Sequence, residues 1–513
     1  MKNKIKVLIF IFIISSVPIL SQPLFAETKT LLTKLSLVEF REALGNNRIF
    51  RDIDISNLDL AGLDLSNTAL YHSTLMNTTL KNVKLPNSLL ISIDMSNCDL
   101  QKADMAGVRI DNSDLSKADL RDANLTCVIM ISNIMKEADL SGANLRSGII
   151  RDTDLSSAVM KNTDLSYSFI NSNLNNAELK NADMHGAYLS DVTLRNANMS
   201  DINLSAAKIE DLNMSGSAEN NANLTKANLS YASIVSSKMD YARLGGAYMN
   251  GIFMDKVDLS SADLSNADIN SAFIIKSVMS GADLRYATLV NSNLNGLKFK
   301  KANMSDADLR KTDLSDADMA KAIMISADLR GADLRRANLK NANLSKSKIE
   351  GVKLDEADLT NAILDEAVLK NVNINKAILN GASLKNVDLT NSDLSGIKMN
   401  KSQLAGAVLN GVNFSNAELS DAVMVKCDLR DTNFAGTNLS GADLSGANLE
   451  GASLIGCNLK HAVLINANMS GADLQEADIR GADFTGVDLN LVKNIQQAKN
   501  LDKAKGVNIT ITE

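Results

Sequence analysis

The sequence predicts an all-β solenoid, and three observations lead to this fold class. A large apolar residue recurs at almost every fifth position from Ile55 to Leu489. Only 4% of the residues are aromatic and none is tryptophan, which suits a thin interior. Three prolines in 513 residues leave almost every backbone N–H available for a hydrogen-bonded ladder. Length alone would favour several globular domains, but the unbroken repeat favours one elongated domain.

The repeat is almost free of exceptions. If the apolar residue is taken as the centre of each unit, one frame of centres runs from Ile55 to Ile170 and a second from Leu174 to Leu489. Of these 88 positions, 87 hold Leu, Met, Ile or Phe, and Glu219 is the exception. Two residues before the centre the side chain is small or β-branched, and the residue between them is most often Asp or Asn.

A period of five excludes a regular helix and a flat strand. On an α-helix, successive centres would lie about 140° apart and form no stripe. On a flat strand, an odd period would send successive centres to opposite faces. The chain must therefore turn at every unit, and Asp and Asn suit such corners. Self-similarity at a short fixed period is typical of a solenoid.

The unit also resembles that of a known family. Residues 441–454 read Gly-Ala-Asp-Leu-Ser-Gly-Ala-Asn-Leu-Glu-Gly-Ala-Ser-Leu, and the pattern over about residues 50–490 resembles the pentapeptide-repeat family. The resemblance implies a right-handed quadrilateral β-helix with four units per coil. The repeat region, residues 51–489, would then form about 22 coils and a rod about 100 Å long at 4.8 Å per coil.

Residues 1–26 are expected to be a signal peptide. Three lysines precede an apolar stretch from Val7 to Val17, and Ala26 offers a small residue for cleavage. A membrane anchor is the alternative, but the apolar run is short and is followed by Pro18. The expected location is therefore the periplasm or the medium of a bacterium, with no integral membrane segment left after cleavage.

Caps are expected at both ends of the rod, because an open solenoid end exposes core and strand edges. In residues 27–50, Ser36 and Glu39 have the spacing of a capping box. Phe40 and Leu44 would share the apolar face of a short helix with Leu37, and Gly45 can end that helix. Residues 490–513 keep a few apolar positions among Lys and Gln and are interpreted as a C-terminal cap.

Two irregularities interrupt the repeat. Ile170 and Leu174 are four residues apart, so one residue is missing near Asn171. We expect a tightened corner or small break there, with stacking continued on both sides. Glu219 lies in the polar stretch from Ser215 to Asn221, so a local loop is a better interpretation than a buried functional carboxylate.

No catalytic, cofactor or metal site is predicted, and the protein is not expected to be an enzyme. His72, His185 and His461 would lie far apart on a rod whose length follows the sequence. The many Asp residues occupy the repeat's turn position, and the sequence has no Gly-rich phosphate loop and no Cys-x-x-Cys pair.

The four cysteines are predicted to be unpaired. Cys98, Cys427 and Cys457 occupy the inward position that usually holds Ala, whereas Cys127 points outward. Cys427 and Cys457 are separated by one and a half coils, so they would lie on opposite sides of the rod.

Charge and export favour a scaffold. Without the three lysines of residues 1–26, 50 basic and 60 acidic residues give a formal charge of −10. The first hypothesis is a non-catalytic exported scaffold that binds a protein, an envelope partner or a second copy of itself. The alternative is an inhibitor or effector that mimics an acidic polymer such as DNA. Nucleic acid itself is not expected as a partner, because the chain is acidic and exported.

One candidate interface stands out from the repeat. The outward position before the centre holds apolar residues at intervals of 20, 20 and 19 residues, which four units per coil would place on one face. Exposed contiguous apolar surface often marks an interface. These side chains could instead stack on one another and stabilise the sheet face, and Ile323, Val423 and Val463 show similar but interrupted apolar residues. The candidate residues are Ile129, Ile131, Ile149, Phe169 and Tyr188.

Overall fold

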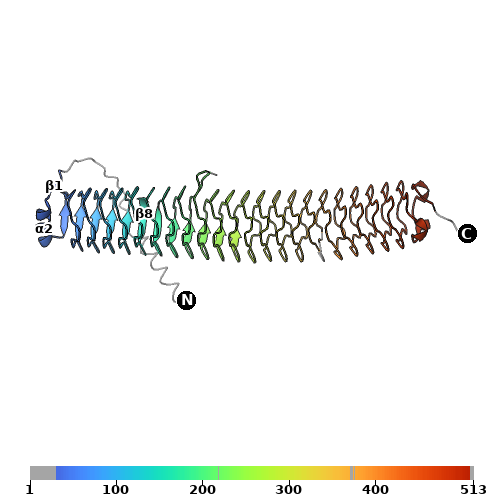
Figure 1. Cartoon of the computed structure of the whole chain (residues 1–513), viewed down its shortest axis with the longest axis horizontal. Coiled ribbons are helices and arrows are strands. Elements are labelled where there is room, and N and C mark those ends of the chain that lie inside the picture. The colour runs from blue at the N-terminus through green and yellow to red at the C-terminus, as the bar shows by residue number, and fades with distance from the viewer. Residues whose placement is uncertain (1–30, 218, 370–373, 375, 509–513) are drawn as a thin grey trace.

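The computed structural model shows a single straight rod with one cap at each end (Figure 1). It describes residues 31–217, 219–369, 374 and 376–508. The expected signal peptide, residues 1–26, lies outside the described residues. The predicted all-β solenoid is confirmed: all strand pairs are parallel, and one sheet joins twelve strands in the order of the coils.

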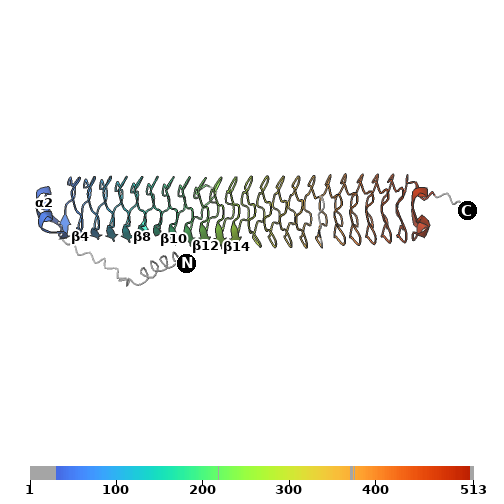
Figure 2. The same cartoon turned by 90° about the horizontal axis from the view of Figure 1, so that it is seen from below.

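Most of the strands lie on one side of the rod. Their order is β1 (Thr33–Lys34), β2 (Ile49–Arg51), β3 (Ile53–Asp54), β4 (Ala69–Tyr71), β5 (Leu89–Ile91), β6 (Arg109–Asp111), β7 (Ile129–Ile131), β8 (Ile149–Asp154), β9 (Phe169–Asn173), β10 (Tyr188–Ser190), β11 (Lys208–Glu210), β12 (Ser233–Val235), β13 (Phe253–Asp255) and β14 (Phe273–Ile275). Figure 2 shows the strands from β4 to β14 in one row. We call the outward side of β2 and β4 to β14 the strand face.

The coil has four sides of five residues. In the first full coil, parallel ladders join Asp54 to Thr74, Asp59 to Thr79, Asp64 to Lys84 and Ala69 to Leu89, each to the matching position one coil later. After β14 the strand side continues as single bridges, from Phe273–Asn293 to Asp473–Lys493. Between Ile55 and Leu489 every apolar centre is at most 2% exposed, so one continuous core runs through the rod.

The N-terminal cap is the helix α2 (Leu37–Asn46), which closes the first coil (Figure 1). The predicted capping box is confirmed: Ser36 Oγ accepts from Glu39 N–H at 3.3 Å, and Ser36 N–H donates to Glu39 Oε2 at 2.7 Å. Phe40 is fully buried, and its ring lies 5.3 Å from that of Phe50. Gly45 does not end the helix. It lies inside the last turn, and Asn47 is the C-cap.

The C-terminal cap changes the period from five to six. Bridges join Asp473 to Lys493, Asp478 to Lys499 and Asp483 to Lys505, so successive sides of the last coil are six residues apart. Each side carries a 3-10 helix, η1 (Leu489–Leu491), η2 (Ile495–Gln497) and η3 (Leu501–Lys503). The sequence shows this as an apolar residue every six positions, a signal that the five-residue pattern hides.

Both irregularities appear in the strand side or next to it. Between β8 and β9, Arg151 pairs with Asn171 and Thr153 with Ser172, so Asp152 has no counterpart. Ile170 still pairs with Ile150 and with Leu189, so the coils remain stacked on both sides of the missing residue. Further on, Asn198 pairs with Asn223, which is five repeat units later instead of four, because one unit leaves the coil as the loop that projects in Figure 1.

That loop contains Glu219, which is exposed. Ser217 N–H donates to the Asn220 carbonyl at 3.0 Å and closes the loop. A Cβ at Gly216 would lie 2.2 Å from the Asn220 oxygen, so only glycine fits this close approach. Glu219 is therefore a loop residue and not a buried carboxylate.

Candidate interaction face

The predicted ladder forms on the strand face. Ile129 pairs with Ile149, Ile149 with Phe169, and Phe169 with Tyr188, each across one coil. All four side chains are half-buried. The shorter step to Tyr188 keeps the column intact, because the missing residue falls at the corner and not in the column. Ile131 lies in the second outward column of this face, where it pairs with Arg151.

The aromatic end of the ladder is fixed by polar contacts. The rings of Phe169 and Tyr188 lie edge to face with centroids 5.4 Å apart. Tyr188 Oη donates to Glu210 Oε2 at 2.5 Å, and Lys208 Nζ lies 2.8 Å from Glu210 Oε1. The hydrogen bond to Glu210, and then burial, raises the pKa of Tyr188 to about 12. Lys208, and then Tyr188, lowers the pKa of Glu210.

The other end of the ladder is also charged. Arg109 precedes Ile129 in the same column, and its Nε lies 2.7 Å from Asp111 Oδ2. The apolar ladder is thus a stretch of four coils closed at both ends by an ion pair. A surface of this kind combines an apolar centre with a polar rim, as protein interfaces do.

One exposed tyrosine borders the ladder. Tyr167 is 53% exposed and stands at the corner just before Phe169. Its ring lies 4.7 Å from His185, and the Arg146 guanidinium lies 5.0 Å from its centroid. A Cβ at Gly186 in the next coil would lie 2.8 Å from the Tyr167 ring, so the ring occupies the space that the glycine leaves. Tyr167 therefore widens the ladder toward the corner.

Sequence reasoning missed a second apolar group in the same column. Phe253 and Phe273 stack with centroids 5.9 Å apart and ring planes 11° apart. Phe273 is 45% exposed and Tyr231, at the corner before β12, is 71% exposed. Because one unit loops out, the step between Lys208 and Ser233 in this column is 25 residues instead of 20. A constant spacing of 20 residues therefore does not connect Phe253 and Phe273 with the ladder. Allowing one step of five units would have found it.

Metal binding and membrane insertion were also considered for the described residues. Among them, no group of three or more His, Cys, Asp or Glu residues is arranged to hold a metal ion. Within the described ranges, no helix is both long and apolar enough to cross a bilayer.

The four cysteines are free, as predicted. Cys98, Cys427 and Cys457 are buried, and Cys127 is exposed. The thiols of Cys98 and Cys427 each donate to a backbone carbonyl at 2.9 Å, that of Leu75 and that of Leu404. Burial raises the pKa of all three buried thiols to about 12, so they are inert core groups.

Comparisons with known proteins agree with this architecture. A family model described as pentapeptide repeats (8 copies) matches residues 88–126, 138–170, 168–201, 237–273, 277–316, 312–351, 353–391, 388–424, 413–451 and 452–490. These segments cover more than half of the chain. No match was found among curated proteins.

Solved structures of three pentapeptide proteins illustrate the range of relatives. HetL, involved in heterocyst differentiation regulation in the cyanobacterium Nostoc sp. strain PCC 7120, is 30% identical over 45% of this chain and 89% of its own, with a TM-score of 0.22. Rfr23 from the cyanobacterium Cyanothece 51142 is 36% identical over 17% and 58%, with a TM-score of 0.17. QnrB1, a plasmid-mediated fluoroquinolone resistance protein, is 20% identical over 41% and 92%, with a TM-score of 0.20. On the evidence of the repeat model and its own coil geometry, the chain belongs to the pentapeptide-repeat family.

Proposed function

We propose that the protein is an exported, non-catalytic scaffold that binds a protein or envelope partner through the strand face. The observation that carries the proposal is the ladder of Ile129, Ile149, Phe169 and Tyr188, which stand in register in successive coils. Most outward positions of the repeat hold Asp or Asn, so four consecutive apolar residues are a departure that a rod alone does not require.

The surroundings of the ladder support binding over internal stacking alone. Ile323 also occupies the outward position, but the residues that pair with it in the adjacent coils are Asn303 and Asn343. Ile363 is likewise isolated, between Asn343 and Ser383. Single apolar residues of this kind are ordinary on a protein surface, whereas a contiguous group with a charged rim fits a partner.

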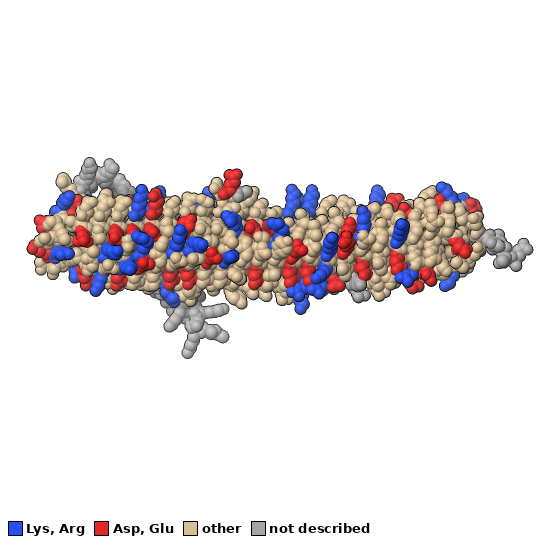
Figure 3. All heavy atoms as spheres, viewed as in Figure 1, with Lys and Arg blue, Asp and Glu red and all other residues tan. Residues whose placement is uncertain are grey.

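The alternative function, mimicry of an acidic polymer, has less support. A polymer mimic needs one sign of charge along its length. Figure 3 shows basic and acidic side chains mixed over the visible face, with Lys and Arg gathered near the middle of the rod. The interspersed charges favour recognition by contact over mimicry.

The test is an affinity capture from the cell envelope and the culture medium with the protein lacking residues 1–26. The double substitution Ile149→Asn and Phe169→Asn should abolish capture of the partner and leave the melting temperature nearly unchanged. Asn is a residue that the repeat itself often places at this position, so the fold tolerates it. The matched control is Ile323→Asn with Ile363→Asn, which also removes two outward apolar side chains but on another face.

Two results would count against the proposal. Capture that survives the ladder substitutions while the melting temperature falls would make the ladder a structural stack. Export is tested separately by fractionation: the full chain should reach the periplasm or medium, and deletion of residues 1–26 should retain it in the cytoplasm. Cytoplasmic retention of the full chain would favour the alternative function.

A further inference from the structure

The formal charge is not uniform along the rod. Residues 27–297 hold 24 basic and 32 acidic residues, a charge of −8. Residues 298–353 hold 13 basic and 8 acidic residues, a charge of +5. Residues 354–513 hold 13 basic and 20 acidic residues, a charge of −7. An acidic rod thus carries one basic band, residues 298–353, near its middle (Figure 3).

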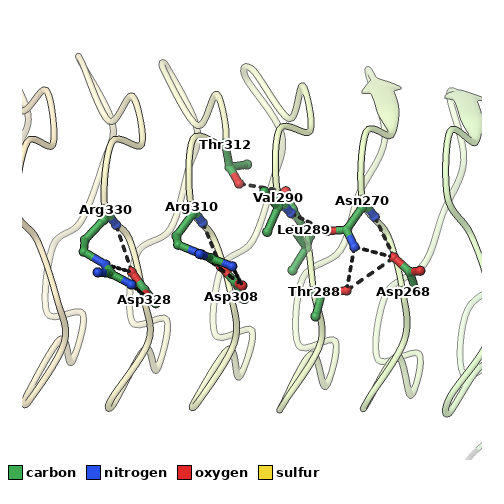
Figure 4. Close-up of polar contacts among 10 residues, drawn as sticks. All are labelled: Asp268, Asn270, Thr288, Leu289, Val290, Asp308, Arg310, Thr312, Asp328 and Arg330. Atoms are coloured by element: carbon green, nitrogen blue, oxygen red, sulfur yellow. Dashed lines mark hydrogen bonds and ion pairs between the residues drawn. The ribbon is translucent and has the colours of Figure 1, made fainter.

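All four arginines of this band are paired with an aspartate of the chain. Figure 4 shows Arg310 and Arg330 folded back onto Asp308 and Asp328, with Nη2–Oδ2 distances of 2.6 Å in both pairs. Both arginines line a shallow hollow of about 320 Å³ with Val290. Lys311 also lines the hollow, but the charges of Arg310 and Arg330 are balanced by Asp308 and Asp328, so the hollow offers a single lysine to an anion.

The lysines of the band behave differently. Lys340 and Lys346 pair with acidic residues of the next coil at 2.9 and 3.7 Å. Lys353 also pairs with an aspartate, at 3.8 Å. Within the described part of the chain, the other six lysines of the band are exposed and form no ion pair, and four of these six share one side of the rod. They are Lys298, Lys300, Lys301 and Lys321, called here the lysine cluster.

The coil brings the lysine cluster together. Lys298 and Lys300 flank the buried Phe299, so both point outward from one side of one coil. Lys301 follows at the corner with φ of 63°, and Lys321 occupies the same corner one coil later with φ of 62°. Lys301 N–H donates to the Ala320 carbonyl, so the two corners are in direct contact. Lys298 forms parallel bridges with Val278 of the preceding coil and Asp318 of the following coil. Asp318 accepts a hydrogen bond from Asn338 at 2.8 Å.

The dimensions of the band decide which kind of anion fits. It spans just under three coils, or about 13 Å along the axis at 4.8 Å per coil. Acidic segments flank it on both sides, and the screening length in physiological salt is about 8 Å. A flat anionic surface, such as a lipid bilayer, would meet the acidic segments and be repelled. A narrow flexible chain can cross the rod at the band and avoid them.

We propose that the lysine cluster binds a flexible linear polymer of phosphate groups that crosses the rod. Lysine ammonium groups bind phosphate as point charges, and four of them within two coils match a chain of closely spaced charges. The site lies outside the strand face, so this inference stands independently of the proposed scaffold function.

The test uses inorganic polyphosphate as the probe, with polyglutamate and vesicles of anionic phospholipid for comparison. The band variant is Lys298→Asn, Lys300→Ser, Lys301→Asn and Lys321→Asn, in which Asn suits the left-handed corners. The control variant changes Lys226, Lys398, Lys401 and Lys426 to Asn. These four lysines are also exposed, and the net charge changes by the same amount.

The expected result is polyphosphate binding that weakens at least about tenfold in the band variant and is retained in the control. The slope of log K against log salt should fall by about 3, as expected for four contacts to a flexible polyanion. Equal weakening in both variants, equally tight binding to vesicles, or no polyphosphate binding at low salt would overturn the proposal. So would self-association abolished by the band substitutions in the absence of polyphosphate binding, because the acidic segments of a second copy would then be the occupant.

Discussion

The strand face and the same side of the rod after Asn293 share one core but differ outside. We call the second region the turn face, which runs from Asn293 to Asp473. On both, the apolar centres are at most 2% exposed. On the strand face, each coil contributes a strand of at least three residues. On the turn face, each coil contributes a single bridge residue followed by a turn. The same buried core is therefore compatible with two different backbone conformations at the surface.

Backbone hydrogen bonding explains the difference. On the turn face the corner closes locally: Ala317 N–H donates to the Leu314 carbonyl at 3.2 Å. The Asp before the centre helps, because Asp313 Oδ1 accepts from Ser315 N–H at 3.0 Å. On the strand face the equivalent N–H can donate to a side chain of the next coil instead. Ile93 N–H, for example, donates to Ser113 Oγ at 3.0 Å.

The same exchange recurs along the strand face. Val257 N–H donates to Ser277 Oγ at 3.0 Å, and Ser113 N–H donates to Asn133 Oδ1 at 2.9 Å. A polar residue in the inward position that usually holds Ala thus replaces the turn hydrogen bond. It lets the corner stay extended and leaves the outward positions free for apolar side chains. Within the ladder, Thr153 N–H makes the same kind of bond, to Ser172 Oγ of the next coil at 3.3 Å.

The largest expected effect tests whether the core is common to both regions. Leu334→Lys on the turn face and Ile110→Lys on the strand face each bury an unpaired charge at a fully buried centre. Each should reduce the free energy of unfolding by several kcal/mol, as measured by urea denaturation. A loss at one site that is much smaller than at the other would show that the core is not continuous.

A smaller effect separates the two kinds of corner. Ser113→Ala should leave the buried Ile93 N–H without its acceptor and cost about 1–3 kcal/mol in chemical denaturation. Ser347→Ala is the control, because the corresponding N–H one coil earlier, that of Ala327, already donates to the Met324 carbonyl within its own turn and does not need the Ser347 hydroxyl. If both substitutions cost the same, the hydroxyl of Ser113 has no special role in the strand corner.

Acid should weaken the coils of the turn face through the Arg–Asp pairs on the neighbouring side. Hydrogen bonds from Arg310 and Arg330 lower the pKa of Asp308 and Asp328 in the folded protein. Because the folded pKa lies below the unfolded value of about 3.9, this stabilisation is present at neutral pH and is lost as the pH falls through the folded pKa. Melting temperatures from pH 7 to pH 2 should fall less steeply in Asp308→Asn with Asp328→Asn. An unchanged slope would mean that these exposed pairs add nothing measurable.

The smallest stability effect is expected for the ladder itself. Ile149→Asn removes one residue from a column of cross-strand pairs, which is worth about 0.2–1 kcal/mol. The fit of Asn to the repeat offsets part of this loss. A melting curve that shifts as far as that of Ser113→Ala would assign the ladder to stability and weaken the case for an interface.

The sequence predicts the core of this molecule better than its surface. The centres and the inward cysteines follow from a pattern in which each position has one environment, and the capping box at Ser36 follows from a local spacing of three residues. The six-residue period of the C-terminal cap was missed because a fixed period of five residues was assumed. The Phe253–Phe273 pair was missed because a fixed number of four units per coil was assumed. The strand corners were missed for another reason. Ser113 and Ser277 look like tolerated replacements of Ala until the coil stacking shows which N–H each one accepts.

The most direct test of the strand face as a binding surface is site-specific photocrosslinking in living cells. A photoreactive phenylalanine analogue replaces Phe169 in one protein and Ile323 in another, so that the same group is presented on two faces of one rod. The account predicts a discrete crosslinked partner from position 169 and none from position 323. Crosslinks of equal yield from both positions, or a discrete product from position 323 alone, would contradict it.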